Sequence, residues 1–193
     1  MIDAAYEEVL DELRNGEPRP ELHWLEGQIL IAQGNRASGI EELARAFVLS
    51  EDLEWILQGY PLEPRLARAV PSAARWARFA LDAVGARLEG DTARERLLLL
   101  DAARQLPDRA LYLGIARIER GRGSELEVFA LERALRGSRW VEGHMRLARA
   151  HREKGDLVAA RRTLERLLDE DANCSEALEL VAELDRLLAQ MAA

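Results

Sequence analysis

Two of the three histidines, His144 and His151, lie seven residues apart in the stretch HMRLARAHREKGDLVAARRTL at 144–164. In a helix this spacing places both imidazoles on one face, about 10.5 Å apart along the axis. One zinc ion needs both nitrogens at about 2.0–2.1 Å, and helical zinc pairs use a one-turn spacing. We therefore expect no metal site here. Instead, both rings should pack against the partner helix, with a carboxylate or water on one nitrogen.

Sequence motifs for catalysis are missing. The chain has no glycine-rich phosphate loop and no nucleophile elbow, and GRGS at 121–124 is too short for either phosphate-binding pattern. Cys174 is the only cysteine, which excludes an intrachain disulfide and a cysteine-based zinc site. The sequence thus predicts a non-enzymatic protein without a cofactor.

Arginine supplies nearly all of the positive charge, since Lys154 is the only lysine. A guanidinium fork matches a carboxylate, so these arginines could recognise acidic groups; a GC-rich genome explains the same bias. The net charge is −8 and the pI is near 5.1. Nucleic-acid binding needs a basic face, so we expect neither a nucleic-acid partner nor an anionic membrane surface.

The elements that must position these side chains are helices. Hydrophobic residues make up 48% of the chain and charged residues 32%, enough apolar material for a sizeable core. Leu, Ala, Arg and Glu dominate, and all four favour helices, whereas the strand formers Val, Thr and Tyr are scarce. The composition predicts an all-α protein.

Glycine followed by a polar residue punctuates the chain between segments with helical apolar spacing. These sites are QGN at 33–35, EGD at 89–91, RGRGS at 120–124 and KGD at 154–156. A left-handed glycine closes one helix, and the polar residue caps the next. The predicted caps are Asn35, Asp91, Ser124 and Asp156. The chain should therefore form a series of helical hairpins.

The hairpins recur at a regular interval. Gly121 and Gly155 are 34 residues apart, and similar stretches follow Gly90 and Gly155. At these positions the chain resembles the tetratricopeptide repeat family, whose unit is a helical hairpin of about 34 residues. In the last unit Leu147, Ala148, Gly155 and Ala160 match the family pattern. The first unit departs from it at Glu26 and Gly39, where the family has leucine and alanine.

The resemblance implies a right-handed α-solenoid of antiparallel helix hairpins in a single domain, 1–193. About four degenerate units would cover 20–50, 76–107, 110–139 and 141–172, with a C-terminal capping helix at 173–190. Three prolines interrupt the repeat in the middle, so a bend or lobe boundary is expected at 59–72.

The resemblance also implies a concave groove, lined by the first helix of each unit, that binds a peptide or protein segment. The residues expected to line it are Trp24, Gln28, Val84, Arg87, Ile115, Met145, Arg149 and Arg152. Its floor would be apolar, and its arginines would pair with acidic groups of the partner. The alternative is that a neighbouring helix, or a second copy of the chain, covers the apolar positions. The Lys and Asn set of the chaperone-binding members is lacking.

The functional expectation is a protein-interaction scaffold or adaptor. Two alternatives stay open: a self-assembling, homo-oligomeric structural subunit, and a regulatory module acting with a separate effector protein. The N-terminal stretch MIDAAYEEVLDELRN is acidic and amphipathic, unlike a signal peptide. No segment approaches the roughly 18 apolar residues of a membrane span, so we expect a cytoplasmic protein without a membrane partner.

Overall fold

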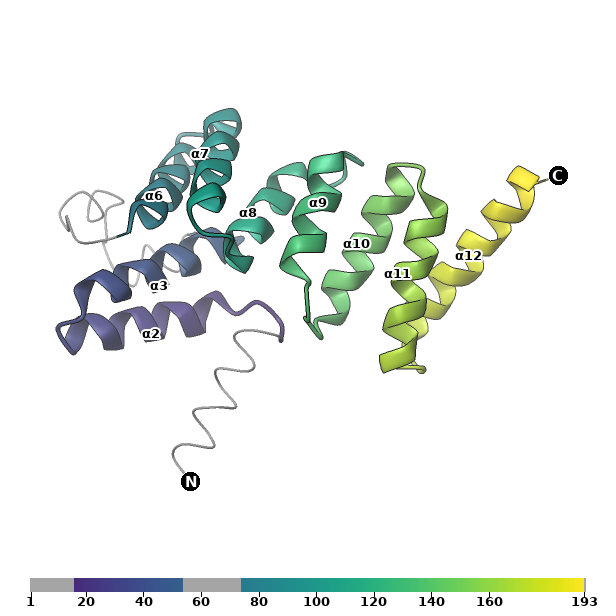
Figure 1. Ribbon diagram of the computed structural model, residues 1–193, viewed down its shortest axis with the longest axis horizontal. Helices are drawn as coiled ribbons and strands as arrows, with labels where there is room; N and C mark the ends of the chain where they lie inside the picture. The colour runs from purple at the N-terminus through teal and green to yellow at the C-terminus, as the bar shows by residue number, and fades with distance from the viewer. Residues whose placement is uncertain (1–15, 54–73, 193) are drawn as a thin grey trace, which may run out of the picture.

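A computed structural model describes residues 16–53 and 74–192 of the chain (Figure 1). Within these ranges the regular structure is entirely helical, which confirms the all-α prediction there. The helices are α2 (Pro20–Ala32), α3 (Arg36–Leu49), α6 (Arg75–Leu88), α7 (Thr92–Gln105), α8 (Arg109–Glu119), α9 (Glu125–Ala134), α10 (Val141–Glu153), α11 (Leu157–Glu170) and α12 (Ser175–Ala192). The bend expected at 59–72 lies outside the described residues.

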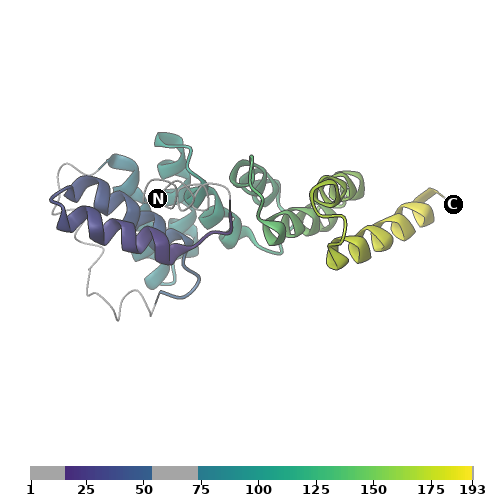
Figure 2. The same ribbon diagram turned by 90° about the horizontal axis from the view of Figure 1, so that it is seen from below.

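Consecutive helices pack as pairs. The pairs α2/α3, α6/α7, α8/α9 and α10/α11 coincide with the four predicted units, and α12 packs on α11. From α8 onward the helices follow one another along the longest axis of the molecule, ending with α12 (Figures 1 and 2). None of the helices described is both long and apolar enough to cross a membrane.

The predicted glycine turns are present between the helices. Gly34 and Gly155 both have a φ of +87°, a left-handed conformation in which a side chain would be strained. Asp91, Ser124 and Asp156 cap the following helices, each accepting a hydrogen bond from the N–H three residues later. Asn35 is the N-cap residue of α3 as predicted, but its side chain makes no capping hydrogen bond.

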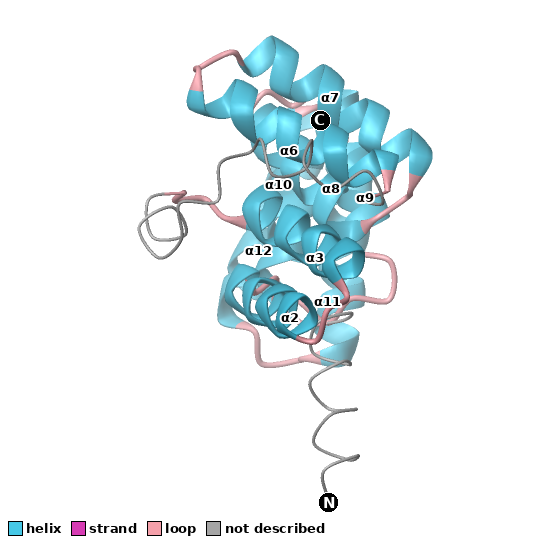
Figure 3. Cartoon of the chain, turned by 90° about the vertical axis from the view of Figure 1, so that its left-hand side faces the viewer, coloured by secondary structure: helices cyan, strands magenta, loops and turns pink. Residues whose placement is uncertain are grey.

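Helix α3 departs from simple stacking. In a solenoid each repeat contacts only its neighbours, yet α3 packs against both α6 and α8. Seen from one end, α2, α3 and the α6/α7 pair lie in succession, with α8 beside them (Figure 3). The approach of α3 to α8 is close, since a Cβ added at Gly114 would lie 2.6 Å from Cγ1 of Val48. The first hairpin is therefore fixed to the third as well as to the second.

The buried apolar side chains form two clusters that meet at α10. The larger cluster runs from α3 to α10 and includes Trp76, Leu111 and Leu131. The smaller one joins α10, α11 and α12 and includes Met145 and Leu164. Because α10 contributes side chains to both clusters, it connects the N-terminal part of the fold to the C-terminal hairpin.

Candidate functional site

The predicted apolar floor of the groove lies inside the helical packing. Val84 is 3% exposed, and Ile115 and Met145 are each 1% exposed. Val84 and Ile115 belong to the larger core cluster and Met145 to the smaller one. These positions agree with the alternative in which neighbouring elements cover the apolar residues. A ligand would reach the polar rim rather than this floor.

Arg87 holds two parts of the chain together. Its guanidinium donates to the carbonyl oxygen of Ser50 at 2.7 Å and also to the carbonyl of Glu51. Burial is the main cause that lowers the pKa of Arg87. The side chain thus ties the segment after α3 to α6, and its donors are used within the protein.

Trp24 and Gln28 lie on α2, far from the C-terminal arginines (Figure 1). Both are partly buried, and Trp24 packs against the larger core cluster. The side-chain nitrogen of Gln28 is buried, and no residue in the described part of the chain accepts a hydrogen bond from it. The eight predicted groove residues therefore do not converge on one site.

Arg149 and Arg152 do share a site, an open cleft between α10 and α12. Nη1 of Arg149 is 3.0 Å from Glu142, and Nη1 of Arg152 is 3.0 Å from Glu183. The side chains of Arg149 and Arg152 are 41% and 33% exposed. Solvent-exposed pairs contribute only about 0–1 kcal/mol, so a ligand carboxylate could replace either glutamate at little cost.

Arg146 lies in a neighbouring cavity of about 410 Å³ and escaped the sequence prediction. Its Nη2 is buried, and within 16–53 and 74–192 no residue pairs with this nitrogen. The guanidinium lies 6.0 Å from the Trp140 ring centroid. Burial lowers the pKa of Arg146, and the charge of Arg120 lowers it further.

The other two arginines of this cavity already have acidic partners. Arg120 pairs with Glu51, and Arg149 pairs with Glu142. Arg146 forms no ion pair within the described residues, although the charges of Glu51, Glu127 and Glu142 act on it. Helical spacing could place it on α10, but spacing does not tell which guanidinium nitrogen has no hydrogen-bond acceptor.

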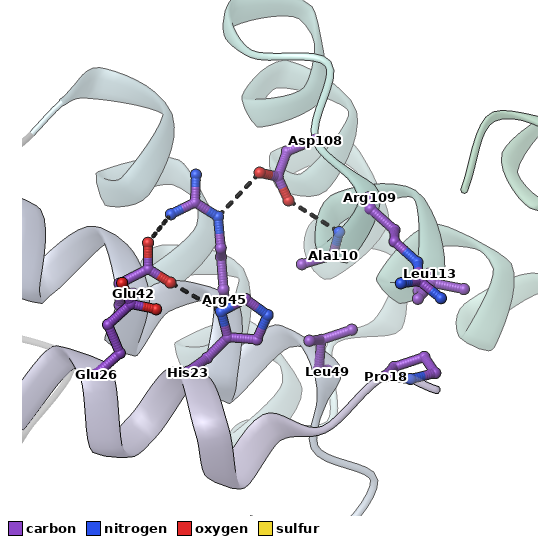
Figure 4. Close-up of a pocket in the computed structure, with 10 residues that line it drawn as sticks. All are labelled: Pro18, His23, Glu26, Glu42, Arg45, Leu49, Asp108, Arg109, Ala110 and Leu113. Carbon is purple, nitrogen blue, oxygen red and sulfur yellow. Dashed lines mark hydrogen bonds and ion pairs between the residues drawn. The ribbon is translucent and has the colours of Figure 1, made fainter. Parts of the chain in front are cut away.

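A second cavity, of about 470 Å³, lies where α2, α3 and the start of α8 meet (Figure 4). Nδ1 of His23 is 2.8 Å from Oε2 of Glu42, whose other oxygen lies 2.6 Å from Nη1 of Arg45. Nε of Arg45 donates to Asp108 at 2.9 Å, and the same guanidinium lies 4.8 Å from the Trp76 ring centroid. A continuous polar chain thus crosses from α2 through α3 to α8.

The two histidines at 144 and 151 form no metal-ligand group with other residues of the described chain. Nε2 of His144 is 2.9 Å from the carbonyl oxygen of Ser138. His151 is 7% exposed, and its Nε2 is 3.9 Å from Glu132 on α9. These polar contacts differ from the prediction of packing against the partner helix: His144 contacts a backbone carbonyl before α10, and His151 faces α9 of the preceding hairpin.

Comparison with known proteins found no family model that matches the chain, and no curated protein or solved structure matches it.

Proposed function

We propose that this chain is a non-enzymatic, tetratricopeptide-like helical scaffold that binds a protein or peptide segment carrying an acidic group. Binding would take place along α10, at the cavity of Arg146 and the adjoining cleft of Arg149 and Arg152. The paired helices and the glycine turns between them support the repeat assignment. An array of rigid hairpins suits this role, because it presents side chains of successive helices along one extended surface.

The buried Nη2 of Arg146 carries the proposal. A buried donor without an acceptor costs about 1–3 kcal/mol, more if it is charged. A ligand carboxylate would supply that acceptor and a charge-assisted hydrogen bond. The adjacent Trp140 ring offers an apolar surface for a neighbouring side chain of the same ligand.

Arg149 and Arg152 would extend the contact along the partner. Arg149 lines both cavities, so a single extended segment could touch it while reaching Arg146 and Arg152. Their present pairs with Glu142 and Glu183 would be exchanged for partner carboxylates. These arginines would set the register of binding more than its strength.

Selection from a random peptide library displayed on phage tests this proposal. The enriched peptides should carry Asp, Glu or a free carboxyl terminus next to an apolar residue. Arg146→Met should weaken their binding about 10- to 100-fold, because a hydrogen bond to a charged group contributes about 1.5–3 kcal/mol. The double change Arg149→Glu and Arg152→Glu should abolish binding, because it places two like charges beside the acidic ligand rather than only removing two contacts.

Arg162→Met is the matched control, because Arg162 is exposed on α11 and lies outside both cavities. Its binding should equal that of the wild type. Circular dichroism of Arg146→Met should match that of the wild type, so that any loss of binding reports the missing guanidinium. If Arg146→Met and the double variant both bind the peptides as tightly as the wild type, α10 is not the binding face.

Self-association is the second candidate, and an exposed apolar pair favours it. Leu25 and Ile29, one turn apart on α2, are 51% and 48% exposed. Two copies could bury these side chains against each other. Sedimentation at several concentrations decides the matter: a monomer at tens of micromolar rules this candidate out, whereas a dimer lost on Leu25→Glu supports it.

A further inference from the structure

Helices α2 and α3 approach each other at two glycines. A Cβ added at Gly27 would lie 2.9 Å from the carbonyl oxygen of Gly39, and one at Gly39 would lie 2.7 Å from that of Gly27. Neither position therefore has room for a side chain. The close approach brings Glu26, next to the first glycine, beside Glu42, one turn after the second.

Three side chains that can bind metals converge beside this crossing (Figure 4). His23 and Glu26 are three residues apart on α2 and share a helical face, while Glu42 comes from α3. One ligand atom from each of the three lies within 4.8 Å of the other two. All three are partly buried, and the side chains of His23 and Glu42 are 14% and 17% exposed.

The charges of the cluster are not balanced. Arg45 forms ion pairs with two carboxylates: its Nη1 pairs with Glu42 and its Nε pairs with Asp108. Glu26 has no hydrogen bond or ion pair to any residue of the described chain. A second cation beside these carboxylates would stabilise both charged forms.

We propose that His23, Glu26 and Glu42 bind a divalent transition-metal ion. One imidazole nitrogen and two carboxylate oxygens suit Zn²⁺, Mn²⁺ or Co²⁺. Three protein ligands leave at least one coordination position open, here toward the cavity of about 470 Å³. Arg45, itself held by Asp108, would orient Glu42 as outer-shell partners orient ligating carboxylates.

The site also accounts for the two departures of the first hairpin from the repeat pattern. Glu26 and Gly39 stand where tetratricopeptide units have leucine and alanine. A leucine would bury apolar surface here, and an alanine would clash with the Gly27 carbonyl. A half-buried glutamate lacks that packing benefit, and the glycine lets the two carboxylates meet.

Metal titration tests the proposal. Protein dialysed against a chelator is titrated separately with ZnCl₂, MnCl₂ and CoCl₂ by calorimetry, and the bound ion is counted by elemental analysis after gel filtration. The wild type should bind one ion per chain. Glu26→Gln and His23→Gln should each weaken binding by at least the roughly 10- to 100-fold that outer-shell changes cause.

Two matched variants change the same residue types elsewhere. His144→Gln alters a partly buried histidine on α10, and Glu21→Gln alters an exposed glutamate on α2. Both should bind the ion as the wild type does. Circular dichroism of metal-free Glu26→Gln should match the wild type, with equal or higher melting temperature, because the change removes like-charge repulsion.

Two results would overturn the proposal. One is a dissociation constant above about 100 µM for all three ions, which would be too weak for a preformed metal site. The other is equal affinity in the wild type, Glu26→Gln and His23→Gln, which would place any bound ion elsewhere. Should Glu26→Gln fail to fold, His23→Gln against His144→Gln decides the question.

Discussion

Arg45 of α3 and Asp108, the N-cap residue of α8, form an ion pair of 2.9 Å across 63 residues of sequence. The other carboxylate oxygen of Asp108 accepts a hydrogen bond from the N–H of Ala110 at 2.8 Å. One carboxylate thus begins a helix and attaches it to the first hairpin. Because both side chains are largely buried, we expect this pair to contribute more to stability than a solvent-exposed ion pair does.

Arg45→Met should destabilise the protein by about 1–3 kcal/mol. The change leaves Glu42 and Asp108 partly buried without their cation, and partial exposure reduces the about 3–5 kcal/mol seen for fully buried pairs. Urea unfolding measures the loss. Arg104→Met is the control, since the pair of Arg104 with Asp101 is exposed, and it should change stability by less than about 0.5 kcal/mol. Equal stability of both variants would contradict the assigned role.

Gly39→Ala should destabilise the α2/α3 hairpin by about 1–3 kcal/mol, the usual effect of overpacking. Its Cβ would lie 2.6 Å from Cγ1 of Ile31 and 2.7 Å from the Gly27 carbonyl oxygen. The matched change is Gly85→Ala within α6, where a Cβ meets nothing within 4 Å. That variant should gain about 0.5–1 kcal/mol from helix propensity. If the melting temperatures of Gly39→Ala and Gly85→Ala shift in the same direction, the close approach of α2 and α3 at Gly39 would be contradicted.

The stability contributed by His151 should fall on acidification. Burial is the main cause that lowers the pKa of His151 below 6.5, with Lys154 adding to it and Glu132 and Asp156 opposing it. The unfolded chain therefore takes up this proton first, so stability is lost as pH falls through about 6.5 and the loss ends below the folded pKa. Unfolding free energies between about pH 7.5 and 5 should fall less steeply in His151→Gln than in the wild type. Parallel curves would contradict this assignment.

The sequence predicted the local features of this fold and missed the tertiary ones. Gly34, Gly155 and the cap at Asp156 were predictable because a helix end is decided within a few neighbouring residues. The meeting of Glu26 with Glu42 depends on the distance between two helix axes, which residue spacing does not reveal. The same holds for the predicted groove, since helical periodicity cannot distinguish a surface left open from one covered by the next hairpin.

The missing partner of Arg146 is a further example. The sequence predicted Arg149 and Arg152 as groove residues, but their pairs with Glu142 and Glu183 depend on which carboxylates the folded chain brings near. Arg146 is distinguished from Arg149 only by that comparison.

The packing of α3 against both α6 and α8 limits how the number of hairpins can change during evolution. A duplicated hairpin inserted anywhere between α3 and α8 would have to break the Arg45–Asp108 pair or the Val48–Gly114 contact. A hairpin added after α11 would disturb only the packing of α12 on α11, because the first helix of the new hairpin would take the place of α12. Lengthened homologues should therefore grow on the C-terminal side and keep the first three hairpins as a fixed set.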